Sequence, residues 1–240
     1  MRKILLFLGF VFGAGTLHSQ VLISLLLGDK LNTGKIEFGL DGGLTMSTIQ
    51  GLDGAKFKNG FNLGFYFDIK MKNPAWMINT GVLVKSPMGA KDLPVYEIGD
   101  ANLDEAFEGG KRSINLGYFN VPIMMKYQFR NHFYVKAGAQ LGLMNKASDE
   151  FTQSVEDGDL EYTIKNRDNY HPIDAGAAVG LGYRLMGGNG MNIGLQYYQG
   201  LIDISVDDQG PNQYNSAFYA NVGIPIGKGK AQKKQQEKSK

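Results

Sequence analysis

Three histidines are the side chains in this sequence best suited to act as a general base near neutral pH: His18, His132 and His171. Only His171 has carboxylates close by in the sequence, because Asp168 and Asp174 flank it. A hydrolytic site also needs an activated nucleophile, and no nucleophile motif accompanies this histidine. The sequence therefore predicts no catalytic residues, and we do not expect an enzyme.

Metal and cofactor sites are not expected from the residue types present either. The chain has no cysteine, which excludes disulfides, thiolate chemistry and cysteine-based zinc sites. Asp157-Gly158-Asp159 is the sharpest candidate for calcium, but it lacks the ligand spacing of a Ca²⁺-binding loop. We therefore expect no metal and no cofactor, and we attribute the acidic loop residues to solvation or to contact with a partner.

Charge is distributed unevenly along the chain. The formal net charge is +2, but residues 20–227 hold 17 basic and 22 acidic side chains, and residues 228–240 hold six lysines. An acidic body is a poor general ligand for nucleic acid. No nucleic-acid partner is therefore expected.

Nine charged residues interrupt segments that are otherwise apolar and strand-like. Each lies on the face opposite the apolar side chains of its segment. Buried charges are expected to be paired, which predicts a structural network of ion pairs in the lumen of a barrel; a path for protons or ions is the alternative. The nine residues are Glu37, Asp41, Asp68, Lys70, Lys85, Lys126, Lys136, Asp174 and Arg184.

The elements that position these residues alternate apolar and polar side chains with a period of two, which predicts β-strands. Short turns separate some segments and long polar loops separate the others, a layout typical of an up-and-down barrel in an outer membrane. The predicted fold is all-β, an eight-stranded antiparallel up-and-down transmembrane β-barrel. Its strands are expected in residues 36–47, 61–70, 76–85, 114–129, 133–143, 173–185, 191–206 and 218–226.

Two of these strands contain a change of phase. In YFNVPIMMKYQF, residues 118–129, and the segment before it, apolar residues occupy even positions before Phe119 and odd positions after Asn120. A β-bulge near these two residues would account for the change and would give Pro122 a position that needs no N–H. A milder slip is expected at Gly200, within the seventh strand.

A soluble barrel such as a lipocalin would alternate in the same way, so the membrane assignment rests on the composition of the two faces. The apolar face carries no charge in any strand, whereas a basic side chain at the bilayer midplane would cost about 2–4 kcal/mol. Glycines recur on the polar face, as expected where a narrow barrel closes around bulky side chains. Aromatic residues near the short turns are expected to form an interfacial belt, namely Trp76, Tyr127, Phe129 and Phe133.

The ends of the chain carry signals for export. Arg2 and Lys3 precede the apolar run 4–17, and small or polar residues follow it, which predicts a cleaved signal peptide in residues 1–19. An uncleaved membrane anchor that also includes the apolar residues 21–27 is the alternative. With cleavage, residues 20–34 form the mature N-terminal segment, residues 35–227 the barrel and residues 228–240 a lysine-rich periplasmic tail.

The signal, the glycine-rich start of the first strand (residues 39–43, GLDGG) and above all residues 118–127 (YFNVPIMMKY) resemble the PorT-like outer-membrane β-barrel family of Bacteroidetes bacteria. The resemblance covers about residues 33–227. It implies a porin-family, OmpA-like barrel in the cell outer membrane, and the namesake of the family serves protein secretion. The lysine-rich tail departs from the pattern, because outer-membrane strands often end the chain with an aromatic assembly signal.

The expected function follows from a narrow barrel and long loops. Eight strands leave an interior that side chains just fill, which disfavours open diffusion. We expect a structural or interaction module, with a monomer favoured, that contacts outer-membrane lipid and binds an envelope or secretion protein through its acidic loops. A narrow small-solute or ion channel and a component of a secretion system are the alternatives. Residues 160–164 alternate, so the third loop is expected to rise as a hairpin that could pair with a partner by its edge.

Overall fold

The computed structural model describes residues 34–155, 158–207 and 210–226. The predicted signal peptide, the N-terminal segment before Gly34 and the lysine-rich tail lie outside these residues. Within the described ranges, no helix is both long enough and apolar enough to cross a bilayer. The helical segments are α3 (Ala101–Ala106), η1 (Arg167–Asn169) and α4 (Leu185–Gly188). The strands are β1 (Ile36–Gln50), β2 (Lys56–Lys70), β3 (Trp76–Leu93), β4 (Lys111–Gln128), β5 (Phe133–Val155), β6 (Gly158–Lys165), β7 (Ile173–Arg184), β8 (Asn192–Gly200) and β9 (Tyr214–Pro225).

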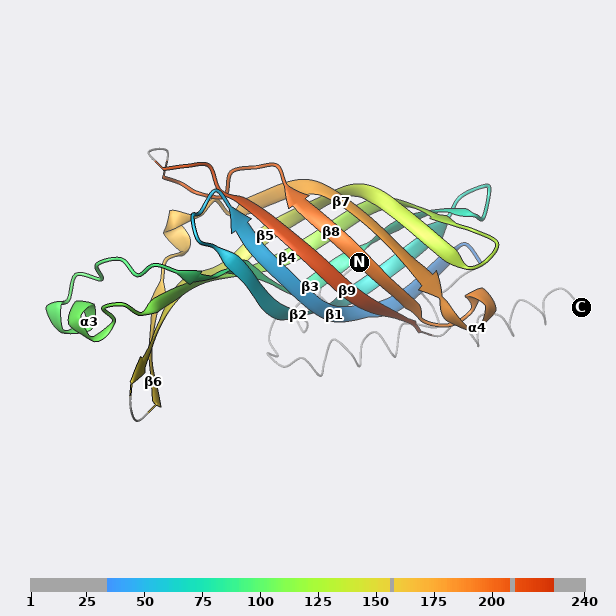
Figure 1. Ribbon diagram of the computed structural model, residues 1–240. Helices are drawn as coiled ribbons and strands as arrows, with labels where there is room; N and C mark the ends of the chain where they lie inside the picture. Colours follow the sequence, from blue (N-terminus) through green and yellow to red (C-terminus); the bar gives the residue numbers. More distant parts are fainter. Residues whose placement is uncertain (1–33, 156–157, 208–209, 227–240) are drawn as a thin grey trace, which may run out of the picture.

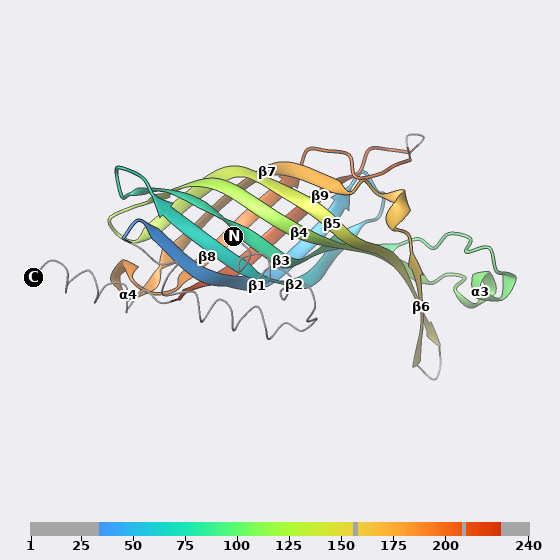
Figure 2. The same cartoon turned by 180° about the vertical axis from the view of Figure 1, so that it is seen from behind.

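Eight of these strands form a closed antiparallel ring. The order is β1, β2, β3, β4, β5, β7, β8 and β9, and β9 returns to pair with β1. Figure 1 shows the strands inclined to the axis of the barrel, with α3 and β6 projecting from one end and the short turns and α4 at the other. Figure 2 shows the opposite side of the same ring. The predicted all-β, eight-stranded fold is therefore confirmed.

One strand, β6, lies outside the ring and forms a hairpin with β5. It pairs with the upper part of β5, from Ser148↔Lys165 to Val155↔Gly158. Because β6 stands last in the strand order, its other edge has no neighbouring strand within the described chain. The alternating residues 160–164 lie in β6, so the hairpin expected from the sequence is present.

Large apolar side chains dominate the outer wall of the barrel. Large side chains exposed on it by 40–60% of their area recur on every strand of the ring, for example Ile123 at 52%, Leu141 at 47% and Val179 at 53%. Aromatic rings gather beside the short turns, where Trp76 lies 4.8 Å from Tyr127 between ring centroids. Such a wall suits hydrocarbon, because each ring strand pairs on both sides and leaves no backbone edge toward lipid.

The predicted bulge near Phe119 and Asn120 is wrong. In β4 the even-numbered side chains face inward from Ile114 to Lys126 without a change of phase. The register shift opposite Tyr118 belongs to β5, since Gly117 pairs with Lys146 and Tyr118 with Met144. The apolar residues change face because the strand leaves the bilayer: beyond it the outer surface is wet and the interior becomes the apolar side.

The seventh strand is shorter than predicted. β8 ends at Gly200, and residues 201–207 and 210–213 belong to a loop that folds over the mouth of the barrel. Backbone bonds tie this loop to the β6–β7 connection, with His171 N donating to Ile204 O at 2.8 Å and Val206 N to Asn169 O at 3.1 Å. Ile204 is fully buried by this arrangement. The alternation of residues 202, 204 and 206 therefore belongs to a loop and not to a strand.

A cluster of apolar and aromatic side chains fills the half of the interior nearest the long loops, and we call it the apolar plug. Its members come from every strand of the ring except β2 and from the loops above, so they pack across the width of the lumen. Tyr118 and Ala217 are 0% exposed, as tightly enclosed as the core of a soluble protein. The plug consists of Ile49, Leu83, Met88, Ala90, Leu93, Ile114, Leu116, Tyr118, Met124, Met144, Ala147, Tyr170, Ala178, Tyr198, Ile204, Ala217 and Tyr219.

Candidate functional site

A second set of interior residues, which we call the charged cluster, fills the half of the lumen nearest the short turns. Its strongest contact joins Lys126 of β4 to Asp68 of β2, with 2.6 Å between Nζ and Oδ2. Asn79 donates to the other carboxylate oxygen at 2.7 Å. The Lys126 ammonium also lies 4.3 Å from the centre of the Tyr134 ring. Both charges are almost fully buried, so they depend on these partners for the stabilisation that water would otherwise provide.

A second ion pair joins strands that are far apart in the sequence. Arg184 at the end of β7 donates to both carboxylate oxygens of Glu37 at the start of β1. Tyr66 adds a hydrogen bond to Glu37 at 3.0 Å, and Asn192 donates to the Tyr66 hydroxyl at 3.2 Å. The pair therefore spans the lumen close to its short-turn end, where a phenol and an amide complete it.

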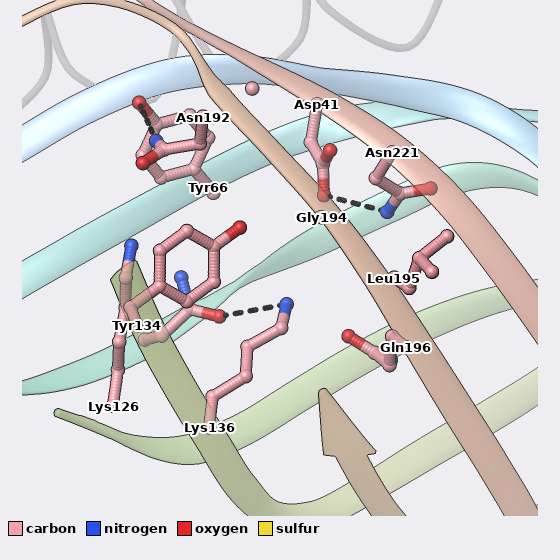
Figure 3. A pocket seen from close by; sticks show the side chains of 12 residues that line it. Asp41, Tyr66, Lys126, Tyr134, Lys136, Asn192, Gly194, Leu195, Gln196 and Asn221 are labelled. Atoms are coloured by element: carbon pink, nitrogen blue, oxygen red, sulfur yellow. Dashed lines mark hydrogen bonds between the residues drawn. The ribbon is translucent and has the colours of Figure 1, made fainter. Parts of the chain in front are cut away.

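Asp41 and Lys136 line a small cavity together with Lys126 and Tyr66, one member or neighbour of each ion pair (Figure 3). Asn221 donates to Asp41 at 3.2 Å, and the Lys136 ammonium donates to Asn79 at 3.5 Å. The cavity measures about 30 Å³, which is room for one or two water molecules. The charged cluster thus holds three carboxylates and three cations and contains space for a bridging water but not for a solute: Glu37, Asp41, Asp68, Lys126, Lys136 and Arg184.

The structure places the other three predicted residues elsewhere. Asp174 is 1% exposed but lies beside the apolar plug, where Asn215 donates to it at 2.9 Å. Lys70 is exposed at the end of β2, so it is not part of the cluster. Lys85 is on the outer wall, with its ammonium 5.9 Å from the centre of the Phe61 ring. The prediction for Lys85 is wrong because β3 has an extra residue at this point: both Lys85 and Leu83 stand opposite consecutive residues of β2.

Sequence reasoning missed the neutral members of the cluster. Tyr66, Asn79 and Asn192 provide hydrogen bonds around the ion pairs, Asn221 donates to Asp41, and the Tyr134 ring lies against the Lys126 ammonium. All of them occupy the polar face of their strands, so the same alternation that selected the charged residues could have selected them. Glycines opposite the rings make this packing possible: an added Cβ on Gly182 or Gly194 would lie 2.4–2.5 Å from Tyr134.

The histidine-centred residues do not come together. His171 and Asp168 are exposed at the long-loop end, whereas Asp174 points into the barrel. Across the described residues, no group of three or more His, Asp and Glu side chains has a geometry that could hold a metal ion. The described interior therefore provides ion pairing in the lumen.

The sequence relationship of the chain agrees with this architecture. Residues 27–206 match the family described as outer membrane protein beta-barrel domain. The chain belongs to this family. It is therefore an outer-membrane β-barrel, and its apolar wall faces the lipid of that membrane. No curated protein sequence matches it.

Solved outer-membrane proteins of similar fold are distant from this barrel. Ail, the attachment invasion locus protein of Yersinia pestis, has 15% identity and a TM-score of 0.41 and covers 80% of this chain and 99% of its own. Neisserial surface protein A has 10% identity and a TM-score of 0.43, with coverages of 79% and 97%. OprG from Pseudomonas aeruginosa has 14% identity and a TM-score of 0.39, with coverages of 81% and 97%. None of these likenesses assigns a function to this barrel.

Proposed function

We propose that this outer-membrane barrel is a closed, non-enzymatic binding module, acting as a monomer, whose β5–β6 hairpin takes an extended segment of a partner protein. The observation that carries the proposal is the unpaired outer edge of β6 within the described chain. Such an edge offers backbone N–H and C=O groups that an added strand can satisfy. A second observation supports it: the plug and the charged cluster fill the lumen in series, which leaves no evident route for a solute.

The hairpin is held firmly at its base and exposed at its tip. Phe151 of β5 is 0% exposed and packs against Phe107 and Tyr96 of the β3–β4 loop, with ring centroids 6.1 and 5.2 Å apart. Tyr162 of β6, which pairs with Phe151, is 38% exposed, and Leu160, nearer the tip, is 41% exposed. A fixed strand with exposed apolar side chains is suited to bind an extended segment, because the strand loses little conformational freedom when the partner binds.

The charge around the edge indicates the chemistry of the partner. β6 carries Asp159 and Glu161, and the facing part of β5 carries Glu150. The neighbouring loop adds the acidic residues of α3, including Asp104. A partner strand that alternates apolar and basic side chains would complement both the exposed apolar residues and this acidic surface. The narrower likeness to PorT-like proteins, carried by residues 118–127, is part of this proposal, and it would make the partner a protein of the secretion machinery.

A designed peptide tests the proposal. We expect a strand of alternating valine and lysine to bind the barrel and to slow hydrogen exchange of the β6 backbone amides. The matched control is the same peptide with every backbone amide N-methylated, which keeps every side chain but removes the N–H donors from both edges. Equal binding of the two peptides would refute edge pairing. Discrete conductance steps from the wild-type barrel in planar bilayers would instead support the channel alternative.

A further inference from the structure

An open cavity of about 460 Å³ lies at the long-loop end, and we call it the loop cavity. It is separate from the charged cluster, because the apolar plug lies between them. Segments from five parts of the chain wall it: the β3–β4 loop at Tyr96, the start of β4 at Arg112, upper β5 at Asp149, the β6–β7 connection at Asn166 and the β8–β9 loop at Gln213. Its volume falls within the range of small-molecule sites.

The walls of the loop cavity are tied to one another and to the barrel. Asn166 N donates to Ala147 O of β5 at 3.3 Å, and the β8–β9 loop is joined to the β6–β7 connection by the two backbone bonds described above. Asp203 fixes the β8–β9 loop itself, since its Oδ1 accepts from Ser205 N at 3.0 Å and from Gln213 N at 2.9 Å. The cavity is therefore formed before a ligand arrives.

Asp149 is the most informative residue of the loop cavity. Its side chain is 2% exposed, and Oδ2 accepts from Arg112 Nη1 at 2.8 Å and from the Tyr96 hydroxyl at 3.1 Å. Its other oxygen, Oδ1, is buried and has no hydrogen-bond partner among the described residues. Asn166 Oδ1 and Gln213 Oε1, on two other walls, are buried acceptors in the same condition. Buried acceptors are normally satisfied, so three of them around one cavity indicate a ligand that brings donors.

The charge of the lining selects among donor-rich ligands. The lining includes three carboxylates, of Asp149, Asp168 and Asp207, against the single guanidinium of Arg112. An organic cation would supply both the donors and the compensating charge. A bare metal ion fits poorly, because the described residues hold no suitable group of carboxylates and histidines and the cavity is far larger than an ion.

We propose that the loop cavity binds a small organic cation whose primary ammonium group donates hydrogen bonds to Asp149 Oδ1 and to the amide oxygens of Asn166 and Gln213. The Tyr170 ring, which lines the cavity and belongs to the apolar plug, forms part of its floor, so the cavity ends blind. The site therefore retains its ligand at the cell surface and does not pass it into the lumen. It is independent of the β6 edge, and either proposal can fail without the other.

Isothermal titration calorimetry on the full chain folded in detergent tests this site with matched probes. Putrescine is the cation, butanediol is the neutral diol of the same length, and calcium chloride is the metal. We expect saturable binding of putrescine alone, with one site per barrel. Asp149→Asn should weaken it about tenfold or more, because a charge-assisted hydrogen bond becomes a neutral one, and Gln213→Leu should weaken it about threefold to tenfold. Asp53→Asn removes an equal charge from an exposed position of the β1–β2 loop and should leave the affinity unchanged.

Any of the following results would overturn the proposal. Equal binding of butanediol would make the ligand a polyol, and calcium binding that depends on Asp149 would make it a metal site. If Asp53→Asn lowers the affinity for putrescine as much as Asp149→Asn does, the binding is a general attraction by an acidic surface. No saturable heat with any probe would remove the site. Heat-modifiable gel migration reports folding, and if Asp149→Asn does not fold, Gln213→Leu and Asp168→Asn decide the question.

Discussion

Replacing Lys126 by methionine removes the cation that neutralises Asp68 inside the barrel. The two side chains are 3% and 1% exposed, and methionine keeps most of the volume of lysine without its charge. Removing one partner of a buried ion pair costs about 3–5 kcal/mol, because the remaining charge is left without compensation. Asn79 still donates to Asp68 at 2.7 Å, so we expect a loss at the lower end, about 3 kcal/mol of unfolding free energy.

Urea unfolding of the barrel in lipid vesicles measures this loss, with the fluorescence of Trp76, the one tryptophan, and heat-modifiable migration as readouts. Lys85→Met makes the same change outside the lumen, next to Ser86, which pairs with Tyr118 where β4 leaves the bilayer, and should alter the free energy of unfolding by less than about 1 kcal/mol. The double variant Asp68→Asn with Lys126→Met should recover at least half of the loss, since no unpaired charge remains. A Lys126→Met loss below about 1 kcal/mol, or a double variant whose cost is the sum of the single ones, would refute the paired interior.

Three further predictions follow from the packing. Gly194→Ala should destabilise the barrel, because the added Cβ would lie 2.5 Å from the Tyr134 hydroxyl. Tyr134→Phe in the same chain should restore most of the lost free energy of unfolding, measured in urea. If the double variant shows no recovery, the contact between these two residues is contradicted. Ile204→Ala should lower the free energy of unfolding by about 2–4 kcal/mol in the same assay, because this side chain is fully buried in the apolar plug. A loss under about 0.5 kcal/mol would mean that the β8–β9 loop does not pack there. Partial desolvation, followed by the Asp149 carboxylate, raises the pKa of Tyr96 to about 12. Its stabilising hydrogen bond should therefore persist past the ordinary tyrosine value of about 10 and be lost as the pH rises through that higher value. The difference in tyrosinate absorbance between wild type and Tyr96→Phe locates the transition, and a midpoint near the ordinary value would contradict this environment.

The period of two was sufficient to find the ring strands because side chains that face lipid and side chains that face a narrow lumen differ sharply in polarity. It could not reveal where a strand leaves the bilayer. In β4, Ile114 and Leu116 face inward just as Lys126 does, yet their apolar character matched the lipid-facing set. The change from a lipid-facing to a water-facing outer surface along β4 was therefore interpreted as a β-bulge in its backbone. Nor does the period show that Ile204 lies in a loop, because three alternating residues are too few to distinguish a loop from the end of a strand.

The charged cluster was predicted in part, for a related reason. Six of its predicted members meet across the lumen because strand parity places them on one face. Lys85 left that face through a single extra residue in β3, and a bulge of this kind has no signature in composition. The tyrosines and amides that complete the ion pairs share the polar face but carry no charge, so a search for ionisable residues passes over them. The loop cavity lay beyond prediction, because it depends on how five separate segments fold together.

The two ion pairs also constrain how the barrel can enter its membrane. Glu37 meets Arg184 across 147 positions of sequence, and Asp68 meets Lys126 across 58. No single hairpin of neighbouring strands contains both members of either pair, so a hairpin inserted alone would carry an uncompensated charge into hydrocarbon. We therefore expect insertion to be cooperative, with β1 brought close to β7 and β2 close to β4 before the interior is sealed from water.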